Sequence, residues 1–122
     1  MRTKYISCFV DKKKVLGKCE AYVGDDNEWV IYYWRVETDF REKGIGKKVL
    51  REVLEKMYKD LGAPPYIDYI WDGENEYVYD FLNRHFQPEC ACPLDNKSDM
   101  YDDWISHVYH LNTSKVFEYF NL

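Results

Sequence analysis

The sequence predicts one α+β domain over residues 1–122, and two observations carry this prediction. The first third consists of β-prone runs separated by polar turns. From Ile45 onward the apolar residues change to a spacing of three and four, which is typical of an amphipathic helix. A chain of 122 residues has room for one domain and no more. The predicted element order is βββ-α-β-α-β-β.

Three strands are predicted in the first third. Tyr5–Val10 and Val15–Val23 are β-prone runs on either side of a polar turn at Asp11–Lys14. After the turn cluster Gly24–Asn27 comes Glu28–Val36, the most β-prone window of the chain because it is rich in aromatic and β-branched residues. Short polar turns between the strands indicate an antiparallel meander.

A helix is predicted from Ile45 to Leu61, with one apolar stripe facing the core. Gly62 accepts the left-handed conformation that ends a helix, and the two prolines at Pro64 and Pro65 cannot continue one.

The second half is predicted to resume with a strand at Tyr66–Trp71. Asn75 can cap a helix that runs to about His85, and a loop follows from about Pro93 to Asp103. Trp104–Leu111 is the last predicted strand. A short terminal helix then follows, with Thr113 or Ser114 as its cap.

Charge and hydropathy exclude several classes of protein. The net charge of −5 argues against a nucleic-acid binder that works by neutralising phosphates. No window approaches the roughly 18 unbroken apolar residues of a membrane span, and the first residues lack the apolar segment of a signal peptide. We therefore expect a cytoplasmic protein. Cys90 and Cys92 have the wrong spacing for a zinc site, so we expect reduced thiols and no metal.

The junction between the third strand and the first helix carries the clearest functional signal. Gly44 and Gly46 stand at the helix start, where glycine lets the backbone approach a ligand closely. The first-turn amides of a helix lack intrahelical partners, and together with the helix dipole they attract anions. Cationic side chains surround the same junction: Arg41, Lys43, Lys47 and Lys48. The pattern indicates a phosphate-bearing ligand, and an ordinary glycine-rich turn with solvated cations is the alternative.

The same residues resemble a known family signature. Arg41-Glu42-Lys43-Gly44-Ile45-Gly46 is similar to the Arg/Gln-x-x-Gly-x-Gly/Ala motif of the GNAT superfamily of N-acetyltransferases. The segment from Asn75 to Phe86 resembles the family's second helix, and the whole resemblance covers roughly Trp29 to Phe86. It implies a GNAT-like mixed central sheet, mostly antiparallel with one splayed parallel pair, flanked by two main helices.

The resemblance also implies a cofactor site for acetyl-CoA as co-substrate. The pyrophosphate would sit on the backbone amides from about Glu42 to Lys47. The pantetheine arm would pair with the strand backbone near Trp34 to Val36, where a backbone N–H would polarise the thioester carbonyl. An acceptor amine would then attack the thioester directly. The implied cofactor-binding residues are Trp34, Val36, Arg41, Glu42, Lys43, Gly44, Ile45, Gly46, Lys47 and Asn75.

The sequence departs from the family at its catalytic positions. The family often has a Tyr seven residues after the helix-opening Asn, and here that position is Leu82, or Phe81 when counted back from Phe86. Tyr79 lies on the same helical face and is our candidate general acid, the alternative being a Tyr that packs against the sheet. No carboxylate occupies the family's occasional position on the third strand.

Alternation along the third strand gives the other catalytic candidate. It puts Val30, Tyr32, Trp34 and Val36 on one face. Tyr32 is a candidate for orienting a water, and Glu28 and Glu37 are the alternatives. We also expect the aromatic rings of Trp34 and Tyr79 to face ligand. These expectations describe an N-acetyltransferase whose acceptor is a primary amine on a small molecule, peptide or protein.

The expected partners exclude nucleic acid and membrane, and a homodimer is one option for assembly. A non-catalytic CoA-binding or protein-interaction module on the same fold is the alternative function, because the usual Tyr is missing.

Overall fold

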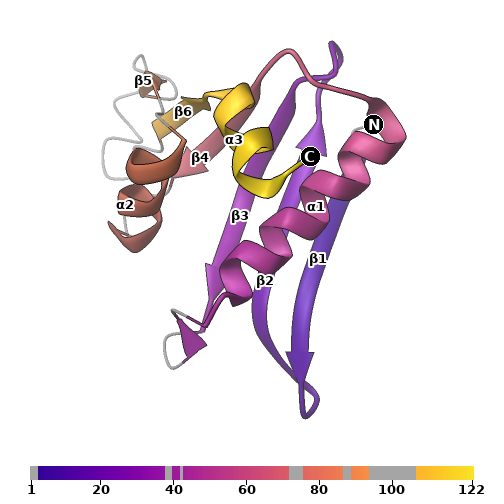
Figure 1. The fold of residues 1–122 in the computed structure, drawn as a ribbon, viewed down its shortest axis with the longest axis vertical. Coiled ribbons are helices and arrows are strands. Elements are labelled where there is room, and N and C mark those ends of the chain that lie inside the picture. The colour runs from indigo at the N-terminus through magenta and orange to yellow at the C-terminus, as the bar shows by residue number, and fades with distance from the viewer. Residues whose placement is uncertain (1–2, 38–39, 42, 72–75, 87–88, 94–106) are drawn as a thin grey trace, which may run out of the picture. The chain divides into compact units, whose positions relative to one another are not determined.

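A computed structural model of the chain describes residues 3–37, 40–41, 43–71, 76–86, 89–93 and 107–122 (Figure 1). The chain divides into two compact units, Met1–Pro64 and Pro65–Leu122, and each contributes three strands. The single domain over residues 1–122 stays a prediction.

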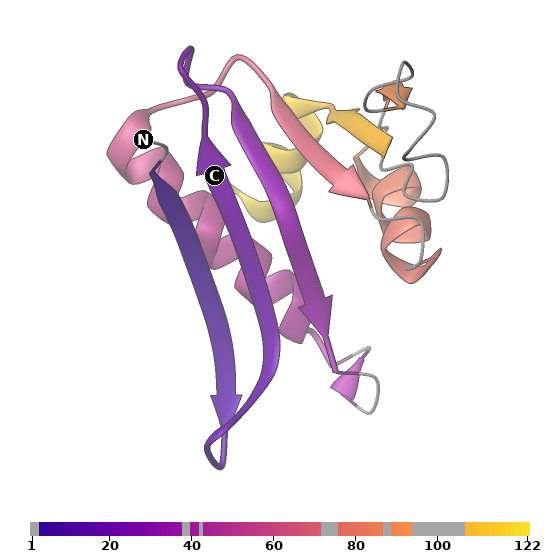
Figure 2. The ribbon, with the colours of Figure 1, turned by 180° about the vertical axis from the view of Figure 1, so that it is seen from behind.

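The first unit is an antiparallel meander backed by one long helix. Its elements are β1 (Lys4–Asp11), β2 (Lys14–Val23), β3 (Trp29–Val36) and α1 (Ile45–Leu61). Both β1 and β3 pair with β2 in antiparallel register, which confirms the predicted meander. In Figure 1, α1 crosses one face of these strands, and Figure 2 shows the opposite face of the strands in front of α1.

The core of the first unit lies between α1 and the sheet. The predicted apolar stripe of α1 is confirmed, since its buried residues are Ile45, Val49, Leu50, Val53, Leu54 and Met57. The sheet supplies the buried side chains of Cys19, Ala21, Trp29, Ile31 and Trp34. The predicted helix end at Leu61 is confirmed. Gly62 has φ +75° and ψ −173°, which favours glycine but differs from the predicted left-handed cap, and its N–H donates to the carbonyl of Tyr58 at 2.9 Å.

The second unit has a strand at its centre and aromatic packing around its helices. Its elements are β4 (Ile67–Trp71), α2 (Glu76–His85), β5 (Glu89–Pro93), β6 (His107–Leu111) and α3 (Thr113–Phe120). The strand β6 pairs in antiparallel register with both β4 and β5. Phe86 meets both Phe81 and Tyr119 edge-on, and each pair of ring centroids is 5.5 Å apart.

The second unit corrects two predicted boundaries. Asn112 caps α3, because its side chain accepts a hydrogen bond from the Lys115 amide at 3.1 Å, so the predicted caps Thr113 and Ser114 were wrong. Pro93, predicted to open a loop, is the last residue of β5. The last strand is described from His107 onward, and residues 94–106 lie outside the described residues.

Candidate functional site

The start of α1 exposes backbone donors. Gly44 is the N-cap residue in the left-handed conformation, with φ +82° and ψ 1°. The first intrahelical bond runs from the Lys48 amide to the Gly44 carbonyl at 3.0 Å, so the preceding first-turn amides point out of the helix end. Among the described residues, no side chain caps this helix and no acidic residue stands in its first turn. Among the residues that the structure describes, none would lie within 4 Å of a Cβ on Gly44.

Trp34 supports this turn from beneath. Its indole Nε1–H donates to the carbonyl oxygen of Gly46 at 2.8 Å, and only 9% of the residue is exposed. A Cβ on Gly46 would lie 3.3 Å from Cγ2 of Val36 and 3.6 Å from the indole nitrogen, so glycine is what lets the helix start sit on these side chains. The Trp34 side chain is thus packed under the turn, although we expected its ring to face ligand.

Gly17 is a part of the site that the sequence pattern did not reveal. It lies opposite Val36 in the β2–β3 pairing, and a Cβ there would come within 2.5 Å of Cγ2 of Ile45. Gly17 therefore makes room for the first residue of α1. An isolated glycine inside a predicted strand was the available signal, since such glycines mark close approach of another segment.

The segment between β3 and α1 is held by backbone and cation contacts. The Glu37 amide donates to the Leu16 carbonyl at 2.8 Å, and the Arg41 Nε–H donates to the Val36 carbonyl at 3.3 Å. The Lys43 ammonium lies 5.3 Å from the ring centroid of Phe40. Arg41 and Lys43 thus stay beside the turn and add positive charge to its exposed amides.

The exposed side chains of Lys47 and Lys48 continue this positive charge along the first turn. The Lys48 ammonium lies 5.1 Å from the ring centroid of Phe9. An anion at the turn would therefore meet backbone donors and cations together.

A β-bulge in β3 changes which side chains share a face. Ile31 pairs with Ala21 and Tyr33 pairs with Glu20, so Tyr32 is an extra residue between them. Directly opposite residues in an antiparallel pair point to the same face. Strict alternation was therefore wrong for this strand, because the bulge reverses its phase at Tyr32.

The two faces of β3 follow from these pairings. Trp34 lies opposite the buried Cys19 and faces α1, as does Ile31 opposite the buried Ala21. Val30 lies opposite Tyr22, on the face away from α1. The predicted grouping of Val30 with Trp34 is therefore wrong.

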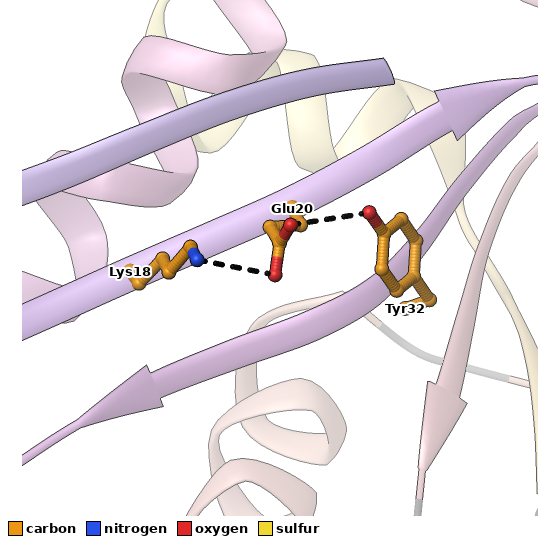
Figure 3. Close-up of polar contacts among 3 residues, drawn as sticks. All are labelled: Lys18, Glu20 and Tyr32. Atoms are coloured by element: carbon orange, nitrogen blue, oxygen red, sulfur yellow. Dashed lines mark hydrogen bonds and ion pairs between the residues drawn. The ribbon is translucent and has the colours of Figure 1, made fainter. Parts of the chain in front are cut away.

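Tyr32 meets a carboxylate that our sequence reasoning missed. Its hydroxyl donates to Oε1 of Glu20 at 3.3 Å, and the Lys18 ammonium lies 3.6 Å from Oε2 of the same residue (Figure 3). Burial, and secondly the charge of Glu20, raise the pKa of Tyr32. Tyr32 is therefore a protonated donor at neutral pH. Finding Glu20 from the sequence would have required the strand register.

Three other predicted site residues lie wholly or partly outside the described part of the chain. Tyr79 lies in α2 of the second unit, and its side chain is outside the described residues, as are Glu42 and Asn75 altogether. The two residues at the family's Tyr position, Phe81 and Leu82, are both buried. The structure thus brings together the predicted coenzyme residues of the first unit that it describes, whereas Tyr79 belongs to the second unit.

Thiol, metal and membrane features add little to the site. Burial raises the pKa of Cys19, so its thiol stays protonated at neutral pH and is a poor nucleophile. No group of three metal-ligating side chains occurs in the described part of the chain. The side chains of Cys90 and Cys92 lie outside that part. The helices described here include none that is long and apolar enough to cross a membrane.

Solved structures share this fold at low sequence identity. A candidate GNAT acetyltransferase from Desulfovibrio desulfuricans has a TM-score of 0.67 and 15% identity, over 90% of this chain and 69% of that one. PaiA N-acetyltransferase from Thermoplasma acidophilum, solved with coenzyme A, has a TM-score of 0.65 and 12% identity, over 88% and 59%.

A third relative was solved with a bisubstrate analogue. Naa50 from Arabidopsis thaliana, in complex with CoA-Ac-MVNAL, has a TM-score of 0.64 and 16% identity, over 86% of this chain and 70% of that one. At identities this low the structural similarity shows the fold alone, and it confirms the predicted GNAT-like α+β class. No curated protein matches the chain.

A family model gives the assignment that these identities cannot. The model described as "Acetyltransferase (GNAT) family" matches residues 2–92, which include β1 to β4, α1 and α2. The match covers the glycine turn at Gly44, its support by Trp34 and the bulge at Tyr32. The chain belongs to the GNAT family of acetyltransferases.

Proposed function

We propose that the chain transfers an acetyl group from acetyl-CoA to a primary amine by direct attack of the amine on the thioester. The observation that carries this proposal is the start of α1, where Gly44 is left-handed, the first-turn amides point outward and cations flank the turn. Membership of an acetyltransferase family supports acyl transfer in general. The structural relatives solved with coenzyme A and with CoA-Ac-MVNAL support the choice of coenzyme and an amine acceptor.

Three parts of the coenzyme would have a counterpart in the first unit. The pyrophosphate would rest on the amides from about Glu42 to Lys47, and the pantetheine arm would run along the backbone from Trp34 to Val36. A backbone N–H of that segment would polarise the thioester carbonyl as charge develops on its oxygen. Because the side chains of Trp34 and Val36 are turned toward α1, the coenzyme meets the strand through its backbone.

The catalytic side chains remain proposals. Tyr32 would place its hydroxyl oxygen to accept a hydrogen bond from the amine, since its own proton is donated to Glu20. Tyr79 would protonate the leaving thiolate. We also propose a reducing, cytoplasmic site of action, where the thiols of Cys8 and Cys19 would stay free.

One observation favours a non-catalytic alternative. Phe81 and Leu82, which stand where the family often has its acid, have no proton to donate and are buried. The alternative is a module on this fold that binds CoA or a protein partner without turnover.

Two measurements separate these functions. Calorimetry with acetyl-CoA measures coenzyme binding. Turnover is measured as the release of free CoA thiol from acetyl-CoA in the presence of polyamines, peptides or aminoglycosides as acceptors. Both binding and thiol release are expected. Binding with no thiol release on any acceptor would favour the non-catalytic module, and absence of binding would exclude both readings. A Tyr79→Phe variant that turns over at the wild-type rate would remove Tyr79 as the acid.

A further inference from the structure

A polar cluster occupies the face of the first unit's sheet that points away from α1. We call Lys18, Glu20 and Tyr32 the β-face cluster (Figure 3). Lys18 and Glu20 alternate along β2 with the buried Cys19 and Ala21, which face α1, so the cluster lies on the opposite face. The side chain of Glu20 is 19% exposed and that of Lys18 is 39% exposed, so a small solute can reach both.

The β-face cluster already holds an alkylammonium group. The ammonium of Lys18 lies 3.6 Å from a Glu20 carboxylate oxygen and 5.9 Å from the ring centroid of Tyr33. A carboxylate beside an aromatic ring is a typical environment for binding an ammonium. A partly exposed ion pair of this kind contributes little to stability, so another ammonium can displace Lys18 at little cost.

The β-face cluster also lies next to the segment assigned to the pantetheine arm. In the β2–β3 pairing Glu20 is opposite Tyr33, and Lys18 is opposite Arg35. Side chains at directly opposite positions have Cβ atoms about 5 Å apart. An ammonium held by Glu20 would therefore stand one strand away from the Trp34–Val36 backbone.

We propose that Glu20 and Tyr32 form the subsite that binds the alkylammonium of the acceptor, and that Lys18 occupies this subsite until the acceptor displaces it. This inference rests on the proposed function and names its substrate class, a primary alkylamine such as a lysine side chain. The Glu20 carboxylate attracts the cation. The Tyr32 oxygen accepts an amine N–H, because its own O–H is donated to Glu20.

The reaction that follows is balanced without a further reactant. The protonated amine first loses one proton to solvent, and the neutral nitrogen forms a bond to the thioester carbon. The carbon–sulfur bond then breaks, the nitrogen releases a second proton, and the leaving thiolate takes up one proton. The products are the acetamide and CoA thiol.

The test uses binding as well as turnover. The probes are Nα-acetyllysine methylamide and its uncharged isostere Nα-acetylnorleucine methylamide, titrated by calorimetry into the whole protein with and without CoA. The wild type is expected to bind the lysine probe about 10-fold more tightly, as expected for one hydrogen bond to a charged group.

Two variants locate the preference. Glu20→Gln should abolish it, and Lys18→Gln should strengthen lysine binding by about 3-fold by removing the internal competitor. Matched controls are Glu55→Gln and Lys59→Gln, which change exposed charges on α1 and should leave the preference unchanged.

The possible outcomes distinguish a failure of the proposed subsite from a failure of the proposed function. Equal wild-type affinity for the two probes, or a lysine preference that survives Glu20→Gln, overturns the subsite whatever the turnover. If acetyl-CoA fails to bind or no thiol is released, the proposed function fails, and the calorimetric preference still reports on the subsite separately.

Discussion

The N-termini of α1 and α3 are built in opposite ways. Asn112 closes the start of α3 with its own side chain, which accepts a hydrogen bond from the Lys115 amide at 3.1 Å. At the start of α1 the N-cap residue is Gly44, and within the described residues no side chain takes that role. The support is placed behind the turn instead, where Trp34 donates to the carbonyl of Gly46.

The difference separates a structural helix start from one shaped for a ligand. A side-chain cap stabilises a helix by about 1 kcal/mol, and it occupies the donors that an anion would need. The first turn of α1 lacks this stabilisation and keeps its donors directed outward. We expect changes at Gly44 to affect coenzyme binding and changes at Asn112 to affect stability alone.

The largest expected effect comes from Gly44→Glu. A carboxylate at the proposed pyrophosphate position would repel the coenzyme and should lower acetyl-CoA affinity by about 100-fold or more, measured by calorimetry. Any side chain at φ +82° also adds roughly 1–2 kcal/mol of backbone strain. Gly44→Asn is the control, because Asn tolerates this conformation and carries no charge. An equal loss of acetyl-CoA affinity in the two variants would mean that backbone strain causes the effect and that the proposed pyrophosphate position is wrong.

Gly17→Ala should disturb the α1 start from behind. Its Cβ would lie 2.5 Å from Cγ2 of Ile45, and overpacking of this kind costs roughly 1–3 kcal/mol of unfolding free energy. Chemical denaturation of Gly17→Ala, Ile45→Ala and the double variant measures the coupling. The double variant should be more stable than the sum of the single losses predicts. Simple additivity would mean that the two residues do not compete for the same space.

Asn112→Ala should cost about 1 kcal/mol of unfolding free energy, because it removes the cap of α3. Its acetyl-CoA affinity should equal that of the wild type. Ser114→Ala is the matched control, since Ser114 is exposed and the cap is Asn112. A stability loss in Ser114→Ala as large as that in Asn112→Ala would contradict this assignment.

Salt should produce the smallest difference between the two helix starts. Raising ionic strength from about 0.05 to 0.5 M screens the helix dipole and the exposed lysines at α1, so acetyl-CoA affinity should fall by roughly 3- to 10-fold. The destabilisation caused by Asn112→Ala should stay constant, because a neutral amide makes that cap. Salt-independent coenzyme affinity would argue against a charged ligand at α1.

The elements of the first unit could be predicted because each depends on neighbours in the sequence. The period of Val49, Leu50 and Val53 predicted α1, and its bounds at Ile45 and Leu61 are confirmed. The glycine turn was predicted for the same reason, since Gly44 and Gly46 belong to a short motif of neighbouring residues.

Features set by register could not be predicted. Tyr32 fits an alternating strand as well as a bulge, because aromatic residues are accommodated on either face of a sheet. The bulge is visible only from the pairing of Ile31 and Tyr33 with β2. The same pairing brings Glu20 of β2 next to Tyr32 of β3. The cap of α3 was missed because Asn112, Thr113 and Ser114 are all good cap residues and sequence alone did not separate them.

The bulge has a consequence for how this chain tolerates insertions and deletions. Without the extra residue, Trp34 and Tyr33 would exchange faces, and one aromatic ring would replace the other. The burial of an aromatic ring at this position therefore favours the observed alignment of β3 only weakly over one shifted by a single residue. Gly17 supplies the missing discrimination, because in a shifted alignment a residue with a Cβ would stand beneath Ile45. A single glycine on the neighbouring strand thus favours the observed alignment of β3.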